Sequence, residues 1–320
     1  MKKGTTLMAN EVVIMSNEGI QRVKKHYEKF QVDRAASGVV FAAKLADTAI
    51  TVYKSGKVLF QGSGASREAS RWGTSEASDK KVEVSSVKGD QLPQNFANLS
   101  VIGSDETGTG DYFGPITVAA CYVPAEKVAL VKELGVKDSK MLTDDVMRKM
   151  APDLMSSISY SVLVLKNEKY NQIQAKGWSQ GKIKALLHNQ ALKHVLNKIA
   201  PQRPDHILID QFAERGIYYN HIKNEKEIIR ENVLFSTKAE QLHVSVAAAS
   251  IIARYAFLKE MDRLTEIAQT TIPKGASSKV DEVAAKIYMK HGEEFLKAIT
   301  KWHFANTQKA ITLVNRKRFG

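Results

Sequence analysis

Four carboxylates stand at or just after the ends of apolar, β-branched segments that are bounded like strands. They are Asp105, Glu106, Asp210 and Glu240. In α/β sheets, functional sites gather where strands end. Carboxylates packed together repel one another and raise their own pKa values unless cations neutralise them. Hard divalent ions with oxygen ligands, Mg²⁺ or Mn²⁺, suit such a site, and two such ions can activate water for phosphodiester cleavage.

Asp105 and Glu106 belong to a glycine-rich stretch, 103–115, that joins two predicted strands. Side chains alternate across a regular strand, so the two acids should face opposite ways and can converge only if the strand breaks there. Gly108 and Gly110 permit such a break and allow a ligand backbone to approach closely. A polar hairpin turn would contain the same residues, and Asp210 and Glu240 would then be ordinary turn acids.

The charge of the chain favours a polyanionic partner. The 320 residues carry a formal net charge of +13 at pH 7, which indicates nucleic acid before a membrane surface; simple solubility is the alternative. No apolar run is long enough to span a bilayer, and no signal-peptide segment follows the basic start. Cys121 is the only cysteine, which leaves no intramolecular disulfide or thiolate metal cluster. We expect a cytoplasmic protein that is monomeric and has no membrane partner.

The elements that must position the acids fall into two domains. Residues 1–72 predict a small α+β domain, with a helix over 11–30 and a three-stranded meander with one open face. Residues 73–97 are polar and lack core residues, so they predict a linker. Residues 98–320 alternate strands and helices, which implies an α/β sheet. Helices are predicted near 126–134, 143–156, 180–199, 243–268, 278–290, 293–300 and 304–315.

The segments around the acids resemble ribonuclease HIII, a bacterial family that is the sister of the type II ribonucleases H. The matching motifs follow in family order and lie at 103–115, 136–140, 209–212, 238–240, 244–254 and 303–307. The resemblance implies a ribonuclease H-like catalytic domain with a mixed central sheet flanked by helices. It carries over the four acids as catalytic residues and metal ligands, and a glutamate at 240 separates this family from the type II enzymes, which have aspartate there.

The same resemblance, together with the chemistry of the loops, gives a set of candidate substrate-binding residues in the larger domain. They are Gly108, Thr109, Gly110, Lys137, Ser139, Lys140, Ser250 and Arg254. The glycine loop would place backbone groups against the ribose, since only the 2′-hydroxyl distinguishes RNA from DNA locally. The lysines would contact phosphates. A turn that needs glycine for positive φ, and solvated loop lysines, are the plainer alternatives.

The small first domain resembles half of a TATA-binding protein, a match carried by residues 51–62. In the family this domain is implied to help hold the substrate, and a curved sheet with one open face can lie on a duplex minor groove. Lys54 and Lys57 are the candidate contacts. Other residues are expected to be structural or solvated, with Tyr112 and Phe113 in the core and Glu214 in solvent. His243 and His303 are less favoured alternatives for metal binding or proton transfer.

The leading hypothesis is an endoribonuclease that cleaves the RNA strand of RNA/DNA hybrids with two metal ions and leaves 5′-phosphate and 3′-hydroxyl ends. The roles of the acids in it are those that the resemblance implies. One alternative is type II behaviour, which is incision at a single ribonucleotide embedded in DNA. Another is a non-catalytic nucleic-acid-binding protein, although binding alone gains nothing from clustered carboxylates beside phosphates.

Overall fold

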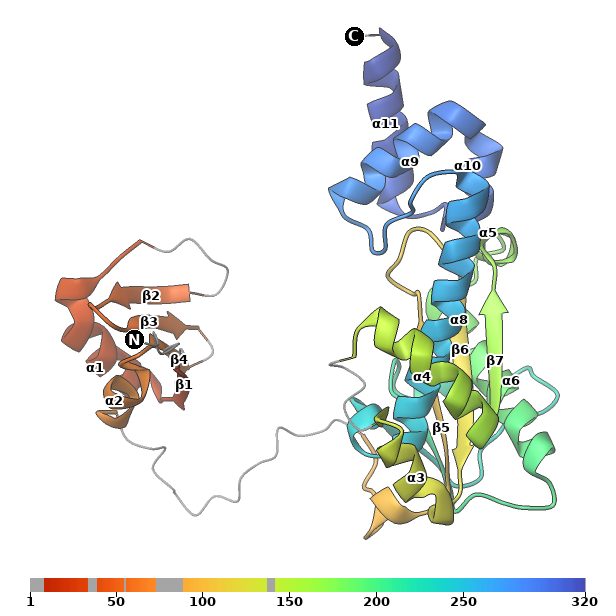
Figure 1. The fold of residues 1–320 in the computed structure, drawn as a ribbon, viewed down its shortest axis with the longest axis horizontal. Helices are drawn as coiled ribbons and strands as arrows, with labels where there is room; N and C mark the ends of the chain where they lie inside the picture. Colours follow the sequence, from red (N-terminus) through yellow and green to blue (C-terminus); the bar gives the residue numbers. More distant parts are fainter. Residues whose placement is uncertain (1–8, 34–38, 55, 73–88, 137–141, 320) are drawn as a thin grey trace, which may run out of the picture. The chain divides into compact units, whose positions relative to one another are not determined.

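The computed structural model describes five stretches of the chain, which are residues 9–33, 39–54, 56–72, 89–136 and 142–319. The chain divides into two compact units, Met1–Ser85 and Ser86–Gly320. Each unit has its own sheet and its own apolar core (Figure 1). Within the described stretches, no helix is long and apolar enough to cross a membrane.

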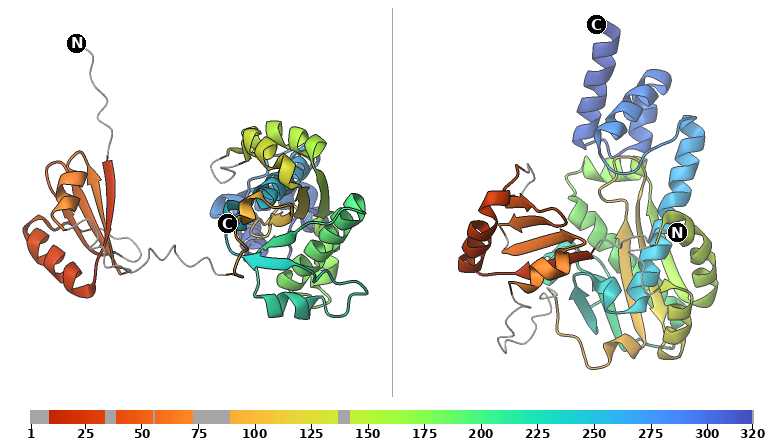
Figure 2. Two further views of the ribbon diagram at one scale, coloured as in Figure 1. Left: turned by 90° about the horizontal axis from the view of Figure 1, so that it is seen from below. Right: turned by 60° about the vertical axis from the view of Figure 1, so that its left-hand side comes forward.

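The first unit is a four-stranded antiparallel sheet, in the order β1-β4-β3-β2, with two α-helices against one face. Val23 and Ala69 of the two helices share one buried cluster with Val52 and Phe60 of the sheet. Both helices lie on the same side of this sheet (Figure 2). The elements are β1 (Ala9–Ile14), α1 (Asn17–Tyr27), the 3-10 turn η1 (Glu28–Phe30), β2 (Val39–Lys44), β3 (Ala49–Tyr53), β4 (Lys57–Gly62) and α2 (Ala65–Ser70).

The predicted helix over 11–30 is wrong in its first part. Ala9–Ile14 is a strand that pairs antiparallel with β4, so the predicted three-stranded meander gains a fourth strand. The valine and isoleucine run in this segment suits a strand better than a helix. The helix begins only at Asn17, where the Ser16 side chain accepts a hydrogen bond from the Gly19 amide.

The face of this sheet away from the helices presents basic side chains. Along β4, Val58 and Phe60 are buried while Lys57 is exposed, as the alternation of a strand requires. Lys44 is exposed at the end of β2, and Lys54 is exposed in the turn before β4. The open face expected from the sequence is therefore present in this unit.

The second unit is built on a mixed five-stranded sheet in the order β7-β6-β5-β8-β9. β5, β6 and β7 are antiparallel neighbours, whereas β8 and β9 run parallel to β5. This confirms the predicted mixed central sheet. The strands are β5 (Val101–Thr107), β6 (Ile116–Val123), β7 (Ser159–Leu165), β8 (His206–Asp210) and β9 (Val233–Ser236).

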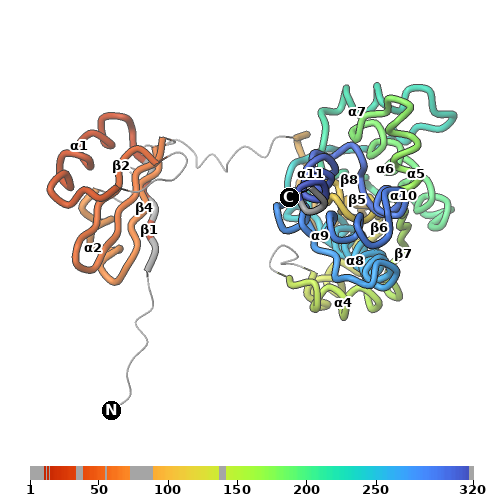
Figure 3. Tube along the Cα trace, turned by 90° about the horizontal axis from the view of Figure 1, so that it is seen from above, coloured from red at the N-terminus to blue at the C-terminus, as the bar shows by residue number. Residues whose placement is uncertain are grey.

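Helices cover both faces of this sheet. α6 and α7 pack with Val118 and Ala120 on one face, whereas α3, α4 and α8 pack with Ala119 and Cys121 on the other. Figure 3 shows α6 and α7 on the opposite side of the strands from α4 and α8. The helices and 3-10 turns are η2 (Phe96–Asn98), η3 (Ala125–Lys127), α3 (Val128–Glu133), α4 (Asp144–Ser157), α5 (Asn167–Gln174), α6 (Gln180–Ile199), α7 (Arg215–His221), η5 (Ala239–Gln241), α8 (Val244–Ala268), α9 (Ser278–His291), α10 (Glu293–Ile299) and α11 (Ala305–Phe319). The sequence analysis predicted neither α5 nor α7.

Helix α8 lies directly against β5, because Gly103 has no side chain. A Cβ atom at Gly103 would lie 2.3 Å from the backbone nitrogen of Val246, which no real contact tolerates. Residues 247–249 of the helix are alanines, and all three are buried at this contact between helix and sheet. Small residues on both sides therefore set the distance between the helix and the strand that carries the first two acids.

His243 is part of this helix start. Its Nδ1 accepts a hydrogen bond from the Ser245 amide at 3.1 Å, and its Nε2 lies 3.1 Å from the Leu99 carbonyl oxygen, to which it must donate. Burial lowers the pKa of His243 to about 4. The ring is thus neutral, and both of its nitrogens form hydrogen bonds within the fold. His243 therefore caps the helix, and this role accounts for it without metal binding or proton transfer.

The last helices form a separate layer around the glycine-rich stretch. α9, α10 and α11 gather at the far end of α8 (Figure 1). Tyr112 and Phe113 are fully buried among their side chains, in agreement with the expectation that both are core residues. Residues more than 180 positions apart in the sequence are therefore in contact here, as between the Lys301 side chain and the Gly114 carbonyl oxygen.

The predicted linker over 73–97 extends too far. Residues 73–88 lie outside the described stretches, but Gly89 forms a bridge with Ser236 at the edge of the sheet. Asp90 accepts a hydrogen bond from the Phe235 amide at 2.7 Å, and Phe96 is buried. The polar composition hid this segment because residues 89–90 attach through backbone groups and one carboxylate, and of the described residues 89–97 only Leu92 and Phe96 add apolar contacts.

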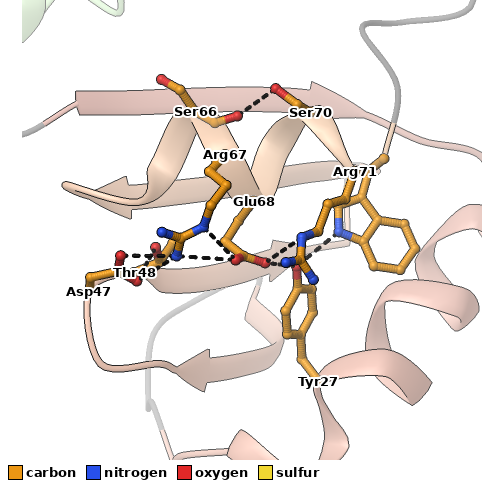
Figure 4. Close-up of polar contacts among 9 residues, drawn as sticks. Tyr27, Asp47, Thr48, Ser66, Arg67, Glu68, Ser70 and Arg71 are labelled. Atoms are coloured by element: carbon orange, nitrogen blue, oxygen red, sulfur yellow. Dashed lines mark hydrogen bonds and ion pairs between the residues drawn. The ribbon is translucent and has the colours of Figure 1, made fainter.

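A buried carboxylate fixes helix α2 of the first unit (Figure 4). The side chain of Glu68 is only 3% exposed, and its oxygens lie 3.4 Å from Arg67 Nε and 3.6 Å from Arg71 Nε. The Tyr27 hydroxyl donates to it at 2.8 Å and accepts in turn from the Trp72 indole. Burial raises the pKa of Tyr27 to about 12, so the phenol remains a donor to this carboxylate.

We therefore expect Glu68→Gln to destabilise the first unit by about 1–2 kcal/mol, since it removes the charge that two guanidinium groups surround. Hydrogen exchange of the β3 and β4 amides would measure this locally, without interference from the second unit. Glu28→Gln, at an exposed position of the same unit, is the matched control. Unchanged exchange in Glu68→Gln would show that the network does not stabilise the unit.

Candidate active site

A cleft of about 450 Å³ lies where strands β5 and β8 end, beside η5 and α8. Three of the four predicted acids line it, and so do the predicted substrate-binding residues of α8. The lining residues are Asp105, Thr107, Leu142, Asp144, Met147, Asp210, Lys238, Glu240, Ser250 and Arg254. The structure thus brings together acids that are far apart in the sequence, as the ends of neighbouring strands predicted.

Each of the three predicted acids that line the cleft is positioned by a different element. Asp105 belongs to β5, and Asp210 ends the parallel neighbour β8. Lys238 adopts a left-handed conformation (φ 57°, ψ 36°) at the start of η5. That turn aims the Ala239 amide at Asp210 Oδ1, to which it donates at 2.9 Å, and it brings Glu240 to the cleft.

The acids of the cleft repel one another. Desolvation, together with the charges of Asp210 and Glu106, raises the pKa of Asp105 to about 8, although the Ser250 hydroxyl donates to its carboxylate. Desolvation also raises the pKa of Asp210, and the neighbouring Glu240 and Glu106 add to the effect against the Ala239 amide. Burial and mutual repulsion therefore disfavour the charged forms of Asp105 and Asp210 more than their hydrogen-bond donors favour them.

Glu106 does not face the cleft. β5 pairs with β6 without interruption through Thr107, with Glu106 opposite Val118, so the predicted break in the strand is wrong. The side chain points instead to α6, where Lys184 Nζ lies 2.8 Å from one carboxylate oxygen and His188 Nε2 lies 2.9 Å from the other. Burial would raise the pKa of Glu106, but His188 and Lys184 together hold it below its usual range.

The imidazole of His188 is fully buried and held from both sides. Its Nδ1 lies 2.8 Å from the Ser104 hydroxyl, and its Nε2 faces Glu106. Lys184 lies above the Phe212 ring, 4.2 Å from the ring centroid. The sequence analysis missed both partners of Glu106; their spacing of four on a predicted helix was the only signal that they share one face.

The glycine-rich loop is a genuine turn. Gly108 has φ 92°, and a Cβ there would lie 2.2 Å from the Pro115 carbonyl oxygen. The Thr109 carbonyl accepts from the Gln180 side chain at 2.9 Å. Nothing lies within 4 Å of a Cβ built at Gly110. The conformational explanation for Gly108 is therefore correct, while Gly110 leaves its backbone open to approach.

A buried lysine fastens the far side of this loop. Lys301 Nζ donates to the carbonyl oxygens of Asp111 and Gly114, both at 2.7 Å, and the Asp111 carboxylate accepts from the Gly275 amide at 2.6 Å. Burial lowers the pKa of Lys301 to about 7. The sequence analysis did not single out this residue, although it lies just before the 303–307 motif.

Of the other residues considered in the sequence, some line the cleft and some lie elsewhere. Arg254 lines the cleft and forms an ion pair with Asp144 at 3.0 Å, which Lys274 also contacts. His303 is exposed beside Tyr170, and Glu214 is exposed at the start of α7; neither lines the cleft. The predicted phosphate contacts Lys137, Ser139 and Lys140 lie outside the described residues.

The composition of the cleft suits a hard divalent cation, because three clustered carboxylates supply oxygen ligands and excess negative charge. The arrangement of the side chains is not yet that of a closed ligand set. Among the described residues, no three histidine, cysteine, aspartate or glutamate side chains converge closely enough to hold one ion. The orientation of Glu106 toward α6 separates one of the four predicted ligands from the rest.

Each of the two units matches a known family model. The family model for ribonuclease HII matches residues 102–307, and a domain of unknown function (DUF3378) matches residues 10–85. The ribonuclease HIII of Lysinibacillus sphaericus is 62% identical over 308 residues, which is 96% of this chain and all of that protein. The ribonuclease HIII of Bacillus subtilis is 52% identical over 313 residues, 97% of this chain and all of that protein.

Solved structures agree. Bst-RNase HIII, crystallised in complex with Mn²⁺, is 45% identical and superposes with a TM-score of 0.71 over 96% of this chain and all of that chain. Aquifex aeolicus RNase H3 is 21% identical with a TM-score of 0.52 and shows the shared fold. The resemblance drawn from the motifs is confirmed over nearly the full length, and the chain belongs to the ribonuclease HIII family, which makes it a ribonuclease of the hydrolase class.

Proposed function

We propose that this ribonuclease cuts the RNA strand of RNA/DNA hybrids internally, using divalent metal ions held by Asp105, Glu106, Asp210 and Glu240. The main support for the proposal is the cleft at the strand ends. Three of these acids, each from a different element, meet there and repel one another. The Mn²⁺ complex of Bst-RNase HIII supports a divalent ion, and Mg²⁺ would serve the same oxygen ligands. We expect 5′-phosphate and 3′-hydroxyl products.

Two bound ions would supply an activated water and would stabilise the leaving oxygen. The residues of the chain would hold and orient the carboxylates that bind these ions. Because burial and the neighbouring carboxylates raise the pKa of Asp105, a cation in the cleft would favour the ionised form of this side chain, which is the form that binds metal. The Ser250 hydroxyl and the Ala239 amide fix the carboxylates of Asp105 and Asp210 respectively.

Substrate recognition would use the walls of the cleft and the glycine loop. Backbone groups at Gly108, Thr109 and Gly110 would meet the ribose 2′-hydroxyl, and the open surroundings of Gly110 favour such an approach. Arg254, held by Asp144, would contact a phosphate of the backbone. The loop that contains Lys137, Ser139 and Lys140 would add further phosphate contacts.

The first unit, proposed at 1–72, would hold the duplex and take no part in the chemistry. It contains none of the four acids, and Lys54 and Lys57 lie on or beside its open face. Phosphate contacts of this kind position a duplex without reading its sequence. We further propose that the enzyme acts as a monomer in the cytoplasm.

The acids should behave as one catalytic unit. Asp210→Asn keeps an acceptor for the Ala239 amide but removes a metal-binding charge, so turnover of a labelled hybrid should fall by roughly 1,000-fold or more. The double variant with Asp105→Asn should lose little beyond this. Asp262→Asn, an exposed ion-pair partner of Arg148, is the control. Substantial turnover by a folded Asp210→Asn variant would contradict the assignment.

The preferred substrate should be a continuous hybrid. A comparison of cleavage rates on an RNA/DNA hybrid and on a DNA duplex with one embedded ribonucleotide, at equal salt and metal concentration, tests this directly. We expect the hybrid to be cut faster, and the product ends identify the chemistry. Preference for the single ribonucleotide would assign type II behaviour, and binding without cleavage of either would leave a binding protein.

The open face of the first unit should contribute binding alone. Lys54→Gln with Lys57→Gln should raise KM, with kcat largely unchanged, and should make the dependence of log KM on log salt shallower by about 1–2, because two phosphate contacts are lost. Lys25→Gln with Lys29→Gln, which removes the same charge at or just after α1, is the control. An identical effect in both pairs would indicate general electrostatic attraction rather than contacts at this face.

A further inference from the structure

The ion pair between Lys184 and Glu106 is the feature of the active site that its proposed chemistry does not use. Both side chains are largely buried, at 13% and 11% exposure, and the ammonium lies 2.8 Å from Glu106 Oε1. The second oxygen of Glu106 is bonded to His188. Both oxygens that a metal ion would need are therefore engaged by donors from α6.

The surroundings of Glu106 differ from those of Asp105, the preceding residue in the chain. Asp105 accepts hydrogen bonds from the neutral Ser250 hydroxyl and the Glu106 amide, and it faces the charge of Asp210. The two adjacent carboxylates are thus in opposite electrostatic states, since one faces like charge and the other faces an ammonium. Glu106 can join the ligand set only by giving up at least one of its contacts to α6.

The two contacts are unequal in their freedom to break. His188 is fully buried and is fixed on its other side by Ser104. Lys184 has a flexible four-carbon stem, and its ammonium lies 4.2 Å from the centroid of the Phe212 ring. That ring would continue to attract the ammonium after the carboxylate leaves. Lys184 is therefore the contact that can be released.

We propose that Lys184 is a counter-ion that competes with the metal for Glu106. It neutralises the carboxylate and holds it against α6 until a divalent cation enters the cleft, and it thereby lowers the affinity of the site for that cation. His188 remains in place and orients Glu106 in both states. This inference rests on the proposed metal-dependent function, and it makes Lys184 a positioning residue that sets metal affinity.

Calorimetric titration of Mn²⁺ into the metal-free full-length chain, without substrate, tests the proposal. Lys184→Met should bind Mn²⁺ about tenfold more tightly than the wild type, because the metal no longer displaces a largely buried ion pair. Lys184→Arg should stay close to the wild type. Lys182→Met is the matched control, since Lys182 lies on the same helix and contacts the Trp178 ring instead; its affinity should not change.

The thermal stability of the same variants gives a readout that does not depend on activity. Metal-free Lys184→Met leaves the largely buried Glu106 carboxylate with His188 as its remaining side-chain partner, so its Tm should fall, and saturating Mn²⁺ should raise its Tm by more than it raises that of the wild type. The gain in affinity should disappear in the double variant with Glu106→Gln. If Lys184→Met does not fold, Lys184→Gln should show the same direction with a smaller change.

The possible results distinguish the competition between Lys184 and the metal from the metal-dependent function on which that inference rests. Unchanged or weaker Mn²⁺ binding by folded Lys184→Met or Lys184→Gln, with normal binding by the wild type, would overturn the competition and leave metal use intact. A lack of Mn²⁺ binding by every variant, including the wild type, would overturn the metal-dependent function and the competition together. Tighter binding that persists with Glu106→Gln would also overturn it, because the effect would not pass through that carboxylate.

Discussion

The active site depends on the close contact between helix α8 and strand β5. Gly103 permits this contact, since a Cβ there would lie 2.3 Å from the Val246 nitrogen. Because the helix starts so close to the strand, Ser250 reaches Asp105, and Arg254 follows one turn later on the cleft wall. The loop before the helix delivers the last acid to the same place. One missing side chain thus sets the position of groups on both sides of the cleft.

The sheet separates the charges that the sequence places side by side. On one face of β5, Asp105 joins the acids of the cleft, and on the other, Glu106 is neutralised by α6. Only an uninterrupted strand achieves this separation, because alternation sends successive side chains in opposite directions. The pleat therefore keeps Glu106 out of the cleft in which the other three carboxylates meet, which limits the electrostatic cost of the site.

Much of this architecture is predictable where local pattern determines structure. The apolar stripe of 180–199 predicts helix α6 with the bounds it has, and the strand-end acids at 105, 210 and 240 meet as expected. The failures lie where long-range contacts determine structure. β1 forms because β4 is there to pair with it, and the partners of Glu106 and the buried Lys301 follow from tertiary packing that no local period encodes. Residues 89–90 attach to the sheet edge through backbone groups and the Asp90 carboxylate, which composition does not reveal.

The fastening of the glycine-rich loop by Lys301 has a consequence for the biosynthesis of the enzyme. Asp111 and Lys301 are 190 residues apart in the sequence. Domains fold as they emerge, from the N-terminal side onward. The strands that carry the acids therefore leave the ribosome long before the lysine that completes the loop beside them. Until Lys301 has emerged, the carbonyl oxygens of Asp111 and Gly114 lack the ammonium group that holds this loop in place.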